Sequence, residues 1–178
     1  MNESQPRFPA QDMTPGVSSE GPLDLAIADF AAAAVRADGV DPVLTEMVRL
    51  RCAQFHDCRL CGSLRTQEAL DCGFDESMQE KLSRHPEAEL DRRTKAALAL
   101  CDAMLIDPTS IEDDLGSELA QHFTQEQIVE ICVDVMKWSQ QKAFVALRIE
   151  PPVAETHLTQ LLFDDNGHPL FGDPIPAE

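Results

Sequence analysis

The sequence predicts an all-α protein, a single-domain helical bundle of about six to seven helices with a short irregular C-terminal extension. From Leu23 onward the apolar residues recur mostly at spacings of three and four. Sustained alternation of apolar and polar residues is missing, and runs of β-branched residues are scarce. A length of 178 residues fits one compact domain, and no internal repeat of the kind found in solenoid proteins is visible.

The composition divides the chain into three parts. Residues 1–21 combine Pro, Gly and Ser with few large apolar residues, which predicts a disordered N-terminal arm. Residues 22–152 carry the helical pattern and form the predicted domain. Residues 153–178 contain two short apolar groups on either side of Asn166 and Gly167, a turn signal that fits a small hairpin. We expect this extension to pack on the core or on a neighbouring subunit.

End signals place three helices in the first half of the domain, over residues 23–37, 42–56 and 58–72. Asp41 and Asp57 precede the second and third helices and have the carboxylate of an N-cap. Pro42 suits the first helical position because its missing N–H and fixed φ cost nothing there. Gly73 is expected to stop the third helix.

Four more helices are predicted in the second half. Two cover residues 75–84 and 91–107. Ser110 with Asp113, and Thr124 with Gln127, have the spacing of a capping box and mark the start of the other two. The last helix is expected to end near Arg148, ahead of a Pro-Pro pair.

The charge balance narrows the choice of partners. Lys and Arg number 14 against 32 Asp and Glu, a formal net charge of −18 that repels nucleic acid and anionic membranes. Because no secretory signal is visible, we expect a cytoplasmic and reducing environment. There the six cysteines are expected to be packed, catalytic or metal-bound rather than a disulfide framework. Four of them occupy apolar helical positions and are predicted to be core residues: Cys52, Cys72, Cys101 and Cys132.

The strongest chemical signal is Cys58-Arg59-Leu60-Cys61, a Cys-x-x-Cys pair at the predicted start of a helix. Free backbone N–H groups, the helix dipole and the charge of nearby arginines all lower a thiol pKa there. The spacing also lets the two sulfurs close into a disulfide and pass two electrons. Two buried small residues, or a zinc site that adds Cys52 and His56, are the alternatives; the four ligands lack a loop of the usual finger length.

Two further residues are candidates for proton transfer. Glu46 lies at the margin of the apolar arc of its helix, where partial burial would give it the raised pKa of a general base. An ordinary pairing with Arg49 is the alternative. His56 can relay protons beside Cys58, or can cap the end of its helix. Arg51 points into the apolar arc and must reach solvent or find a buried acid.

The segment from Leu44 to Gly73, LTEMVRLRCAQFHDCRLCGSLRTQEALDCG, resembles the carboxymuconolactone decarboxylase family and, within it, the AhpD-like alkylhydroperoxidase branch. In that branch a Glu precedes the two cysteines at the spacing of Glu46, Cys58 and Cys61. A later segment, HFTQEQIVEICVDVMKWSQQKAFVALRIEP, is similar to the second half of the family. The resemblance covers most of residues 23–172.

The resemblance implies an all-helical fold that assembles into homotrimers or hexamers and holds no cofactor. It implies that a hydroperoxide oxidises Cys61, that Cys58 closes the disulfide, and that Glu46 shares a proton relay with a His four residues after Cys61. In this chain that position is Arg65, which cannot pass protons near neutral pH. The predicted helix places Arg65 one turn beyond Cys61 on the same face, where its charge can stabilise a thiolate.

We therefore expect a cysteine-based antioxidant oxidoreductase with thiol-disulfide reductase activity and weaker peroxidase activity, because sulfur leaving groups need less protonation than alkoxides. Its electrons would come from an external dithiol, for example of the lipoamide type. Exposure at the helix end favours Cys58 as the attacking thiol, whereas the family favours Cys61 for peroxides, and the choice stays open for disulfides. Two other functions compete: a lyase for an acidic lactone, whose basic pocket would need Arg49, Arg51, Arg59 and Arg65, and a redox sensor without turnover.

Overall fold

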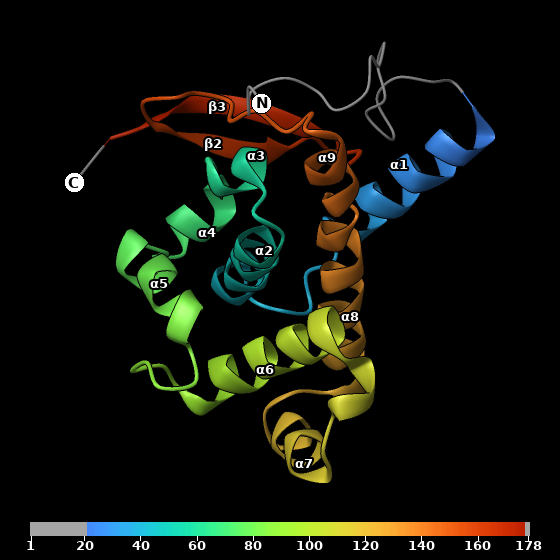
Figure 1. The fold of residues 1–178 in the computed structure, drawn as a ribbon, viewed down its shortest axis with the longest axis vertical. Coiled ribbons are helices and arrows are strands. Elements are labelled where there is room, and N and C mark those ends of the chain that lie inside the picture. Colours follow the sequence, from blue (N-terminus) through green and yellow to red (C-terminus); the bar gives the residue numbers. More distant parts are fainter. Residues whose placement is uncertain (1–20, 177–178) are drawn as a thin grey trace.

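A computed structural model describes residues 21–176, and it is built mainly from helices (Figure 1). The all-α prediction is confirmed. The helices are α1 (Pro22–Ala34), α2 (Pro42–His56), α3 (Arg59–Gly62), α4 (Gln67–Asp71), α5 (Glu76–Lys81), α6 (Arg92–Ile106), α7 (Asp113–His122), α8 (Gln125–Ser139) and α9 (Lys142–Leu147). Short 3₁₀ turns cover Leu82–Arg84 and Pro108–Ser110. The predicted N-terminal arm lies outside the described residues except for Gly21.

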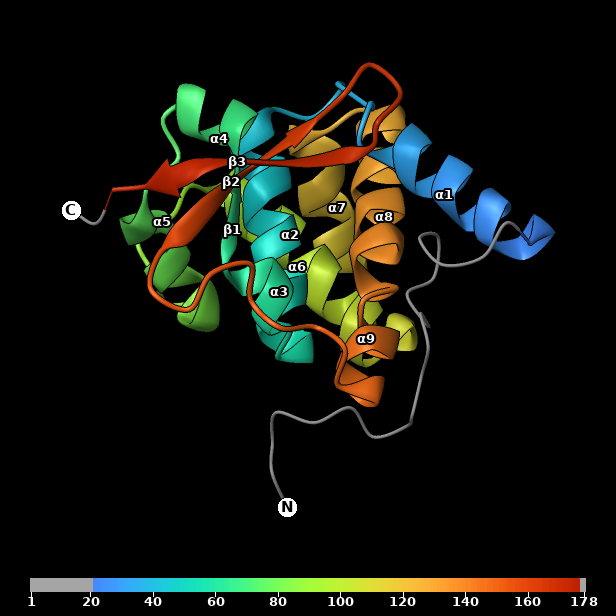
Figure 2. The same ribbon diagram turned by 90° about the horizontal axis from the view of Figure 1, so that it is seen from above.

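Helix α2 lies at the centre of the bundle, where it packs against α6 and α8 (Figures 1 and 2). Its apolar residues cover most of its circumference, so burial on several sides is the stable arrangement. The main core joins side chains from these three helices, among them Leu44, Val48 and Cys52 of α2, Ala97, Leu100 and Cys101 of α6, and Ile131, Val135 and Trp138 of α8.

The predicted caps mostly form. Asp41 accepts a hydrogen bond from the Leu44 N–H at 3.0 Å at the start of α2, and Asp91 caps α6 in the same way. Thr124 and Gln127 make the reciprocal bonds of a capping box on α8. The cap predicted at Ser110 is wrong: α7 begins at Asp113, and Glu112 is its N-cap residue.

The long helix predicted over residues 58–72 is wrong. The chain forms the single turn of α3, then a strand β1 (Leu64–Thr66), then α4. The reason lies far away in the sequence: β1 pairs in parallel with β2 (Leu158–Phe163), with Leu64 opposite Thr159. Asp57 also differs from its predicted role, because it takes a left-handed conformation with φ 54° and ends α2 instead of capping the next helix. The helix predicted to end near Arg148 is divided at Gln140 into α8 and α9.

The C-terminal extension forms the small hairpin that the Asn166-Gly167 turn signal predicts, and it is more regular than the rest of that prediction. Strand β2 pairs antiparallel with β3 (Pro169–Ile175), so the sheet has the order β1-β2-β3. The hairpin lies across α2 and brings its turn to α1 (Figure 2). There Arg36 donates to the Asn166 carbonyl at 2.5 Å. Gly167, with φ 82°, sits so close to Ala32 that an added Cβ would lie 2.6 Å from the Ala32 carbonyl oxygen.

Within residues 21–176, no helix combines the length and the hydropathy needed to cross a bilayer.

Candidate active site

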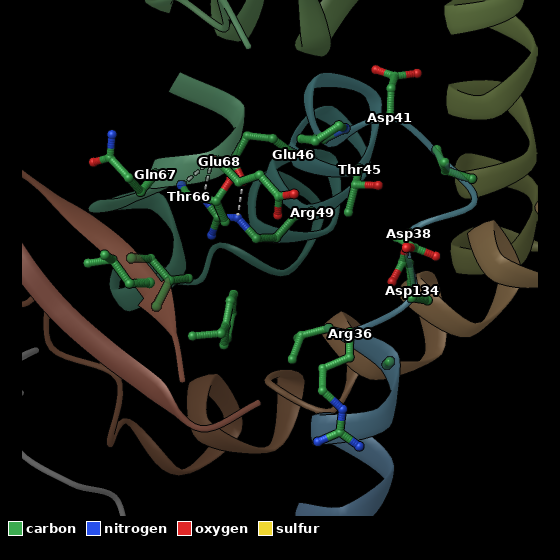
Figure 3. Close-up of a pocket in the computed structure, with 18 of the residues that line it drawn as sticks. Arg36, Asp38, Asp41, Thr45, Glu46, Arg49, Thr66, Gln67, Glu68 and Asp134 are labelled. Carbon is green, nitrogen blue, oxygen red and sulfur yellow. Dashed lines mark hydrogen bonds and ion pairs between the residues drawn. The ribbon is translucent and has the colours of Figure 1, made fainter. Parts of the chain in front are cut away.

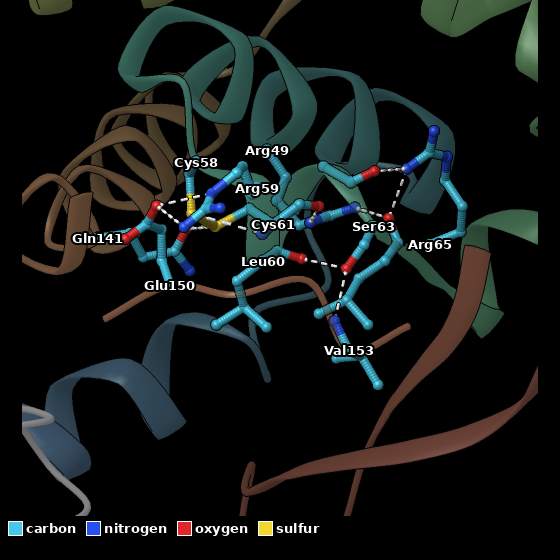
Figure 4. Close-up of a disulfide and its surroundings, with 12 residues drawn as sticks. Arg49, Cys58, Arg59, Leu60, Cys61, Ser63, Arg65, Gln141, Glu150 and Val153 are labelled. Carbon is cyan, nitrogen blue, oxygen red and sulfur yellow. Dashed lines mark hydrogen bonds and ion pairs between the residues drawn. A yellow bond between two sulfur atoms is a disulfide. The ribbon is translucent and has the colours of Figure 1, made fainter. Parts of the chain in front are cut away.

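The two cysteines of the Cys-x-x-Cys motif are joined as a disulfide (Figure 4). Their Cα atoms lie 5.4 Å apart. Cys58 is the N-cap of α3, and its sulfur accepts from the Cys61 N–H at 3.4 Å. Both residues are buried, with 3% and 2% of their surface exposed, so exposure does not distinguish the attacking thiol. Since α3 is one turn long, few peptide dipoles align there and the dipole support expected from a long helix is small.

Arg65 lies in β1 and not on the helical face predicted for it. Its guanidinium pairs with Glu76 at 2.7 Å and donates to the Gly62 carbonyl at 2.8 Å. In Figure 4 its side chain points away from the disulfide. The expectation that Arg65 follows Cys61 by one helical turn is therefore wrong, because the strand pairing turns this segment out of the helix.

The four arginines near the motif do not form one basic pocket. Each pairs with its own carboxylate: Arg49 with Glu46, Arg51 with Asp102, Arg59 with Glu150, and Arg65 with Glu76. Arg51 thereby finds an acid, although Asp102 is half-buried and not fully buried. The Asp102 carboxylate also accepts from His85 at 2.8 Å. The basic pocket that a lactone lyase would need is not present in these four side chains.

Glu46 is fully buried and makes a two-pronged ion pair with Arg49 inside α2. Arg49 Nε lies 2.6 Å from Glu46 Oε2, and Arg49 Nη2 lies 2.6 Å from Glu46 Oε1. Thr66 adds a hydroxyl bond at 2.9 Å and a backbone bond at 3.3 Å to the same carboxylate. Both carboxylate oxygens are thus occupied, and the pairing with Arg49 weighed from the sequence is the arrangement present.

Arg49 connects this ion pair to the cysteine motif. Its guanidinium donates to the carbonyl of Cys61 at 2.9 Å and to the carbonyl of Leu64 at 2.6 Å. Only 1% of Arg49 is exposed. On a helical wheel of residues 42–56, Arg49 falls with Thr45 and His56 in the polar gap, a pattern that predicts an exposed side chain. Its burial contradicts that prediction. The Glu46–Arg49 pair holds the segment that carries Cys61 through its backbone.

Gln141 contacts the sulfurs of the motif, whereas His56 contacts Ser139 of α8. The side-chain oxygen of Gln141, between α8 and α9, contacts Cys61 Sγ and lies 3.7 Å from Cys58 Sγ. His56 lies in the last turn of α2, and its Nε2 is 3.3 Å from Ser139 Oγ. Burial, with a smaller contribution from Lys142, lowers the pKa of His56. Its ring is therefore mainly neutral near pH 7.

Two cavities meet at Arg49 and Trp138. The first, of about 500 Å³, is lined by many carboxylates and is called the acidic cavity; Figure 3 shows Glu46, Glu68, Asp41 and Asp134 around it. Burial, with Glu130 adding to it, raises the pKa of Asp134 to about 7. The second, of about 450 Å³, is called the apolar cavity. Cys61 lines the apolar cavity and Cys58 does not.

The remaining cysteines do not join this site. Cys52 Sγ lies 3.7 Å from Cys101 Sγ in the core, which is consistent with their predicted burial. Cys72 is exposed, so its prediction as a core residue is wrong, and Cys132 is half-buried. Among residues 21–176 no group of three or more His, Cys, Asp or Glu side chains is arranged to hold a metal ion.

Solved structures identify the fold. A protein of unknown function from Agrobacterium tumefaciens, ATU0492, assigned provisionally to antioxidant defence as AhpD, superposes with a TM-score of 0.59 at 22% identity, over 73% of this chain and 88% of that one. The chain has an AhpD-like fold. The debrominase Bmp8 shares it with a TM-score of 0.61 at 16% identity, over 74% and 72% of the two chains. An uncharacterized peroxidase-related protein from Silicibacter sp. TM1040 shares it at 0.60 and 18% identity, over 74% and 71%.

The AhpD-like fold confirms the fold expected from the sequence resemblance. The relatives found by sequence similarity are themselves uncharacterized, so they indicate no activity for this chain. Rv2313c and MT2376, uncharacterized proteins of two Mycobacterium tuberculosis strains, are each 34% identical over 144 residues, which cover 80% of this chain and 51% of the relative. The chain thus spans about half the length of these curated relatives. No protein-family model matches it.

Sequence reasoning missed three residues that line the site in this AhpD-like fold. Gln141 and Lys137 lie in a segment that reads as ordinary helix surface, and Trp138 reads as core. A fourth residue of the site, Arg49, could be recognised from the sequence. It follows Glu46 by three residues, which is the spacing of a helical ion pair.

Proposed function

We propose that the protein is a cysteine-based antioxidant oxidoreductase in which Cys58 and Cys61 are the redox-active pair. The observation that carries the proposal is a disulfide between these residues with Cys61 on the wall of the apolar cavity. Two proteins of the same fold support the proposal: ATU0492, which is assigned provisionally to antioxidant defence, and the peroxidase-related protein from Silicibacter. A cysteine variant of the debrominase Bmp8 was solved in complex with 2,3,4-tribromopyrrole. That complex is consistent with a small apolar substrate for the present protein.

In the proposed reaction Cys61 is the attacking thiol, because it faces the cavity. With a disulfide substrate, the Cys61 thiolate forms a mixed disulfide and releases one substrate thiolate; Cys58 then attacks Cys61 and releases the other. With a hydroperoxide, Cys61 attacks the outer oxygen, the O–O bond breaks, and the alkoxide takes a proton and leaves. The Cys61 sulfenic acid then condenses with the Cys58 thiol, with loss of water. An external dithiol, for example of the lipoamide type, reduces the disulfide again.

We propose that disulfides react faster than hydroperoxides. Arg65 holds Glu76 and cannot pass protons, and the oxygens of Glu46 are taken by Arg49 and Thr66. Glu46 is therefore assigned a positioning role through Arg49. Neutral His56 is the proton carrier that the proposal retains. An alkoxide needs a proton more than a thiolate does, so peroxide turnover suffers more from this arrangement.

The proposal includes a homotrimer or hexamer. Apolar side chains stand exposed on the outer strand and on α1: Phe171 by 56%, Leu170 by 51%, Leu25 by 57% and Leu23 by 74%. Such side chains gain stability when a neighbouring subunit covers them. Light scattering on the eluting protein measures the assembly directly, and a monomer at micromolar concentration would contradict this part.

The test is steady-state turnover of hydroxyethyl disulfide and cumene hydroperoxide, with dihydrolipoamide as the electron donor. We expect Cys58→Ser and Cys61→Ser each to abolish turnover of both substrates. Cys72→Ser removes an exposed free thiol and is the matched control, with unchanged rates. A preserved rate in either active-site variant would overturn the proposal. Oxidation in a single turnover without steady-state activity would indicate a redox sensor, and lactone decarboxylation by the double Ser variant would indicate a lyase.

A further inference from the structure

The apolar cavity has the size and the walls of a small-molecule site. Its volume of about 450 Å³ falls in the range of roughly 300–1,000 Å³ that ligand pockets occupy. Its walls come from several helices and strands, among them Ile27 of α1, Cys61 of α3, Trp138 of α8, Phe144 of α9 and Phe163 of β2. Among the described residues, no Asp or Glu lines it. The cavity therefore lacks carboxylates although the chain contains 32 Asp and Glu residues and has a formal net charge of −18.

Three side chains that can carry positive charge line the same cavity, and two of them are already paired. Arg49 holds Glu46, and His168 lies 3.2 Å from an Asp164 oxygen. The third is Lys137. In the part of the chain that the structure describes, no carboxylate lies within ion-pair distance of its ammonium. Its Nζ lies instead over the Trp138 ring, 2.8 Å from the centroid, and 5.8 Å from the centroid of Phe163.

We propose that the apolar cavity binds a small molecule with an apolar body and one carboxylate or similar anionic group, and that Lys137 is the counter-ion of that group. This binding proposal rests on the proposed function in one respect. The ligand is taken to be the substrate itself, so its disulfide or hydroperoxide group is the one reduced at Cys61. The apolar walls select the body of the ligand, and the unpaired ammonium selects its charge.

The electrostatics of Lys137 support an anionic ligand. Burial, then the charge of Arg49, lowers the pKa of Lys137 well below its ordinary range, and the opposing influence of Asp134 is weaker. Asp134 lines the acidic cavity, and the pKa of about 7 means that it is only partly ionised at neutral pH. The Lys137 side chain thus lacks a full counter-charge, and an anion in the apolar cavity would supply one and favour its charged form.

The test is calorimetric titration of the reduced protein with octanoate and with octanamide, which match in size and differ in charge. We expect octanoate to bind at least tenfold more tightly. Lys137→Met should remove the preference, and Lys137→Arg should retain most of it. Lys142→Met removes the same charge from an exposed position on α9 outside the cavity lining, so the preference should persist. Bound octanoate should also slow the alkylation of Cys61 by N-ethylmaleimide, which places the ligand in this cavity.

Equal binding of the two ligands, no binding of either, or a preference that survives in Lys137→Met would each overturn the inference. These outcomes are separate from a failure of the proposed function. Turnover of neutral disulfides without a charge preference would remove only the inference. Selective octanoate binding by a protein that turns over no substrate would remove the redox proposal and leave the anion site.

Discussion

Replacement of Glu46 by Gln tests whether the buried ion pair of α2 supports the cysteine motif. The substitution keeps the shape of the side chain and removes its charge. The Arg49 guanidinium would stay buried with two backbone carbonyls, those of Cys61 and Leu64, as its remaining acceptors. Loss of one member of a buried pair costs about 3–5 kcal/mol, because the other charge is left uncompensated.

The removal of Arg49 should cost more than the removal of the Glu46 charge. Arg49→Met leaves the carboxylate with only the two Thr66 bonds. It also takes the donor from two buried carbonyls, and each unsatisfied group adds about 1–3 kcal/mol. We therefore expect Arg49→Met to lower the free energy of unfolding by about 5 kcal/mol or more, a larger loss than that of Glu46→Gln.

Urea unfolding followed by circular dichroism measures both variants, with Glu68→Gln as the control. Glu68 is an exposed acid on α4, so its replacement should change stability by less than about 0.5 kcal/mol. Wild-type stability in Glu46→Gln would refute the buried-pair reasoning. If that stable variant also lost turnover, Glu46 would act chemically and not by positioning.

Three further predictions concern stability and the motif. Thr124→Ala removes the capping box of α8 and should cost about 1 kcal/mol in the same unfolding assay; an unchanged midpoint would contradict the cap. Asp134 has a folded pKa raised from 3.8 to about 7, so its ionisation destabilises the fold as pH rises through that window. Asp134→Asn should therefore raise stability by about 2–4 kcal/mol at pH near 9 and by little below pH about 4, and a pH-independent effect would refute it. Arg65→His breaks the Glu76 pair and should cost about 2–4 kcal/mol without raising peroxidase turnover; the exposed Arg84→His is its control, and a faster peroxidase would restore the relay role of this position.

Local signals in the sequence determined much of the helical fold. Asp41 with Pro42, and Thr124 with Gln127, mark true helix starts because their capping bonds involve neighbours three residues away. The break after Gly62 could not be predicted in this way. It depends on pairing between Leu64 and Thr159, and the local sequence from Cys58 to Cys72 carries a helical pattern that the distant strand overrides.

The sequence predicted the two cysteines of the site but not the side chains that surround them. The Cys-x-x-Cys spacing identified Cys58 and Cys61, and the structure pairs them. The surroundings depend on which helices approach α3. Gln141 and Lys137 come from a segment about 80 residues later, and nothing in their local pattern marks them. The helical pattern predicts an exposed Arg49, because it does not show that the distant segment with Cys61 and Leu64 covers the polar side of α2 as well.

The central claim is that Cys58 and Cys61 act as one two-electron redox unit, and equilibrium titration against a lipoamide and dihydrolipoamide buffer tests it most directly. The disulfide fraction, measured by mass spectrometry after alkylation, should follow a single transition with a slope of about 30 mV per tenfold change. The bond should map to these two cysteines and should vanish in Cys61→Ser. Free thiols at Cys58 and Cys61 across the whole range of buffer ratios would contradict the account.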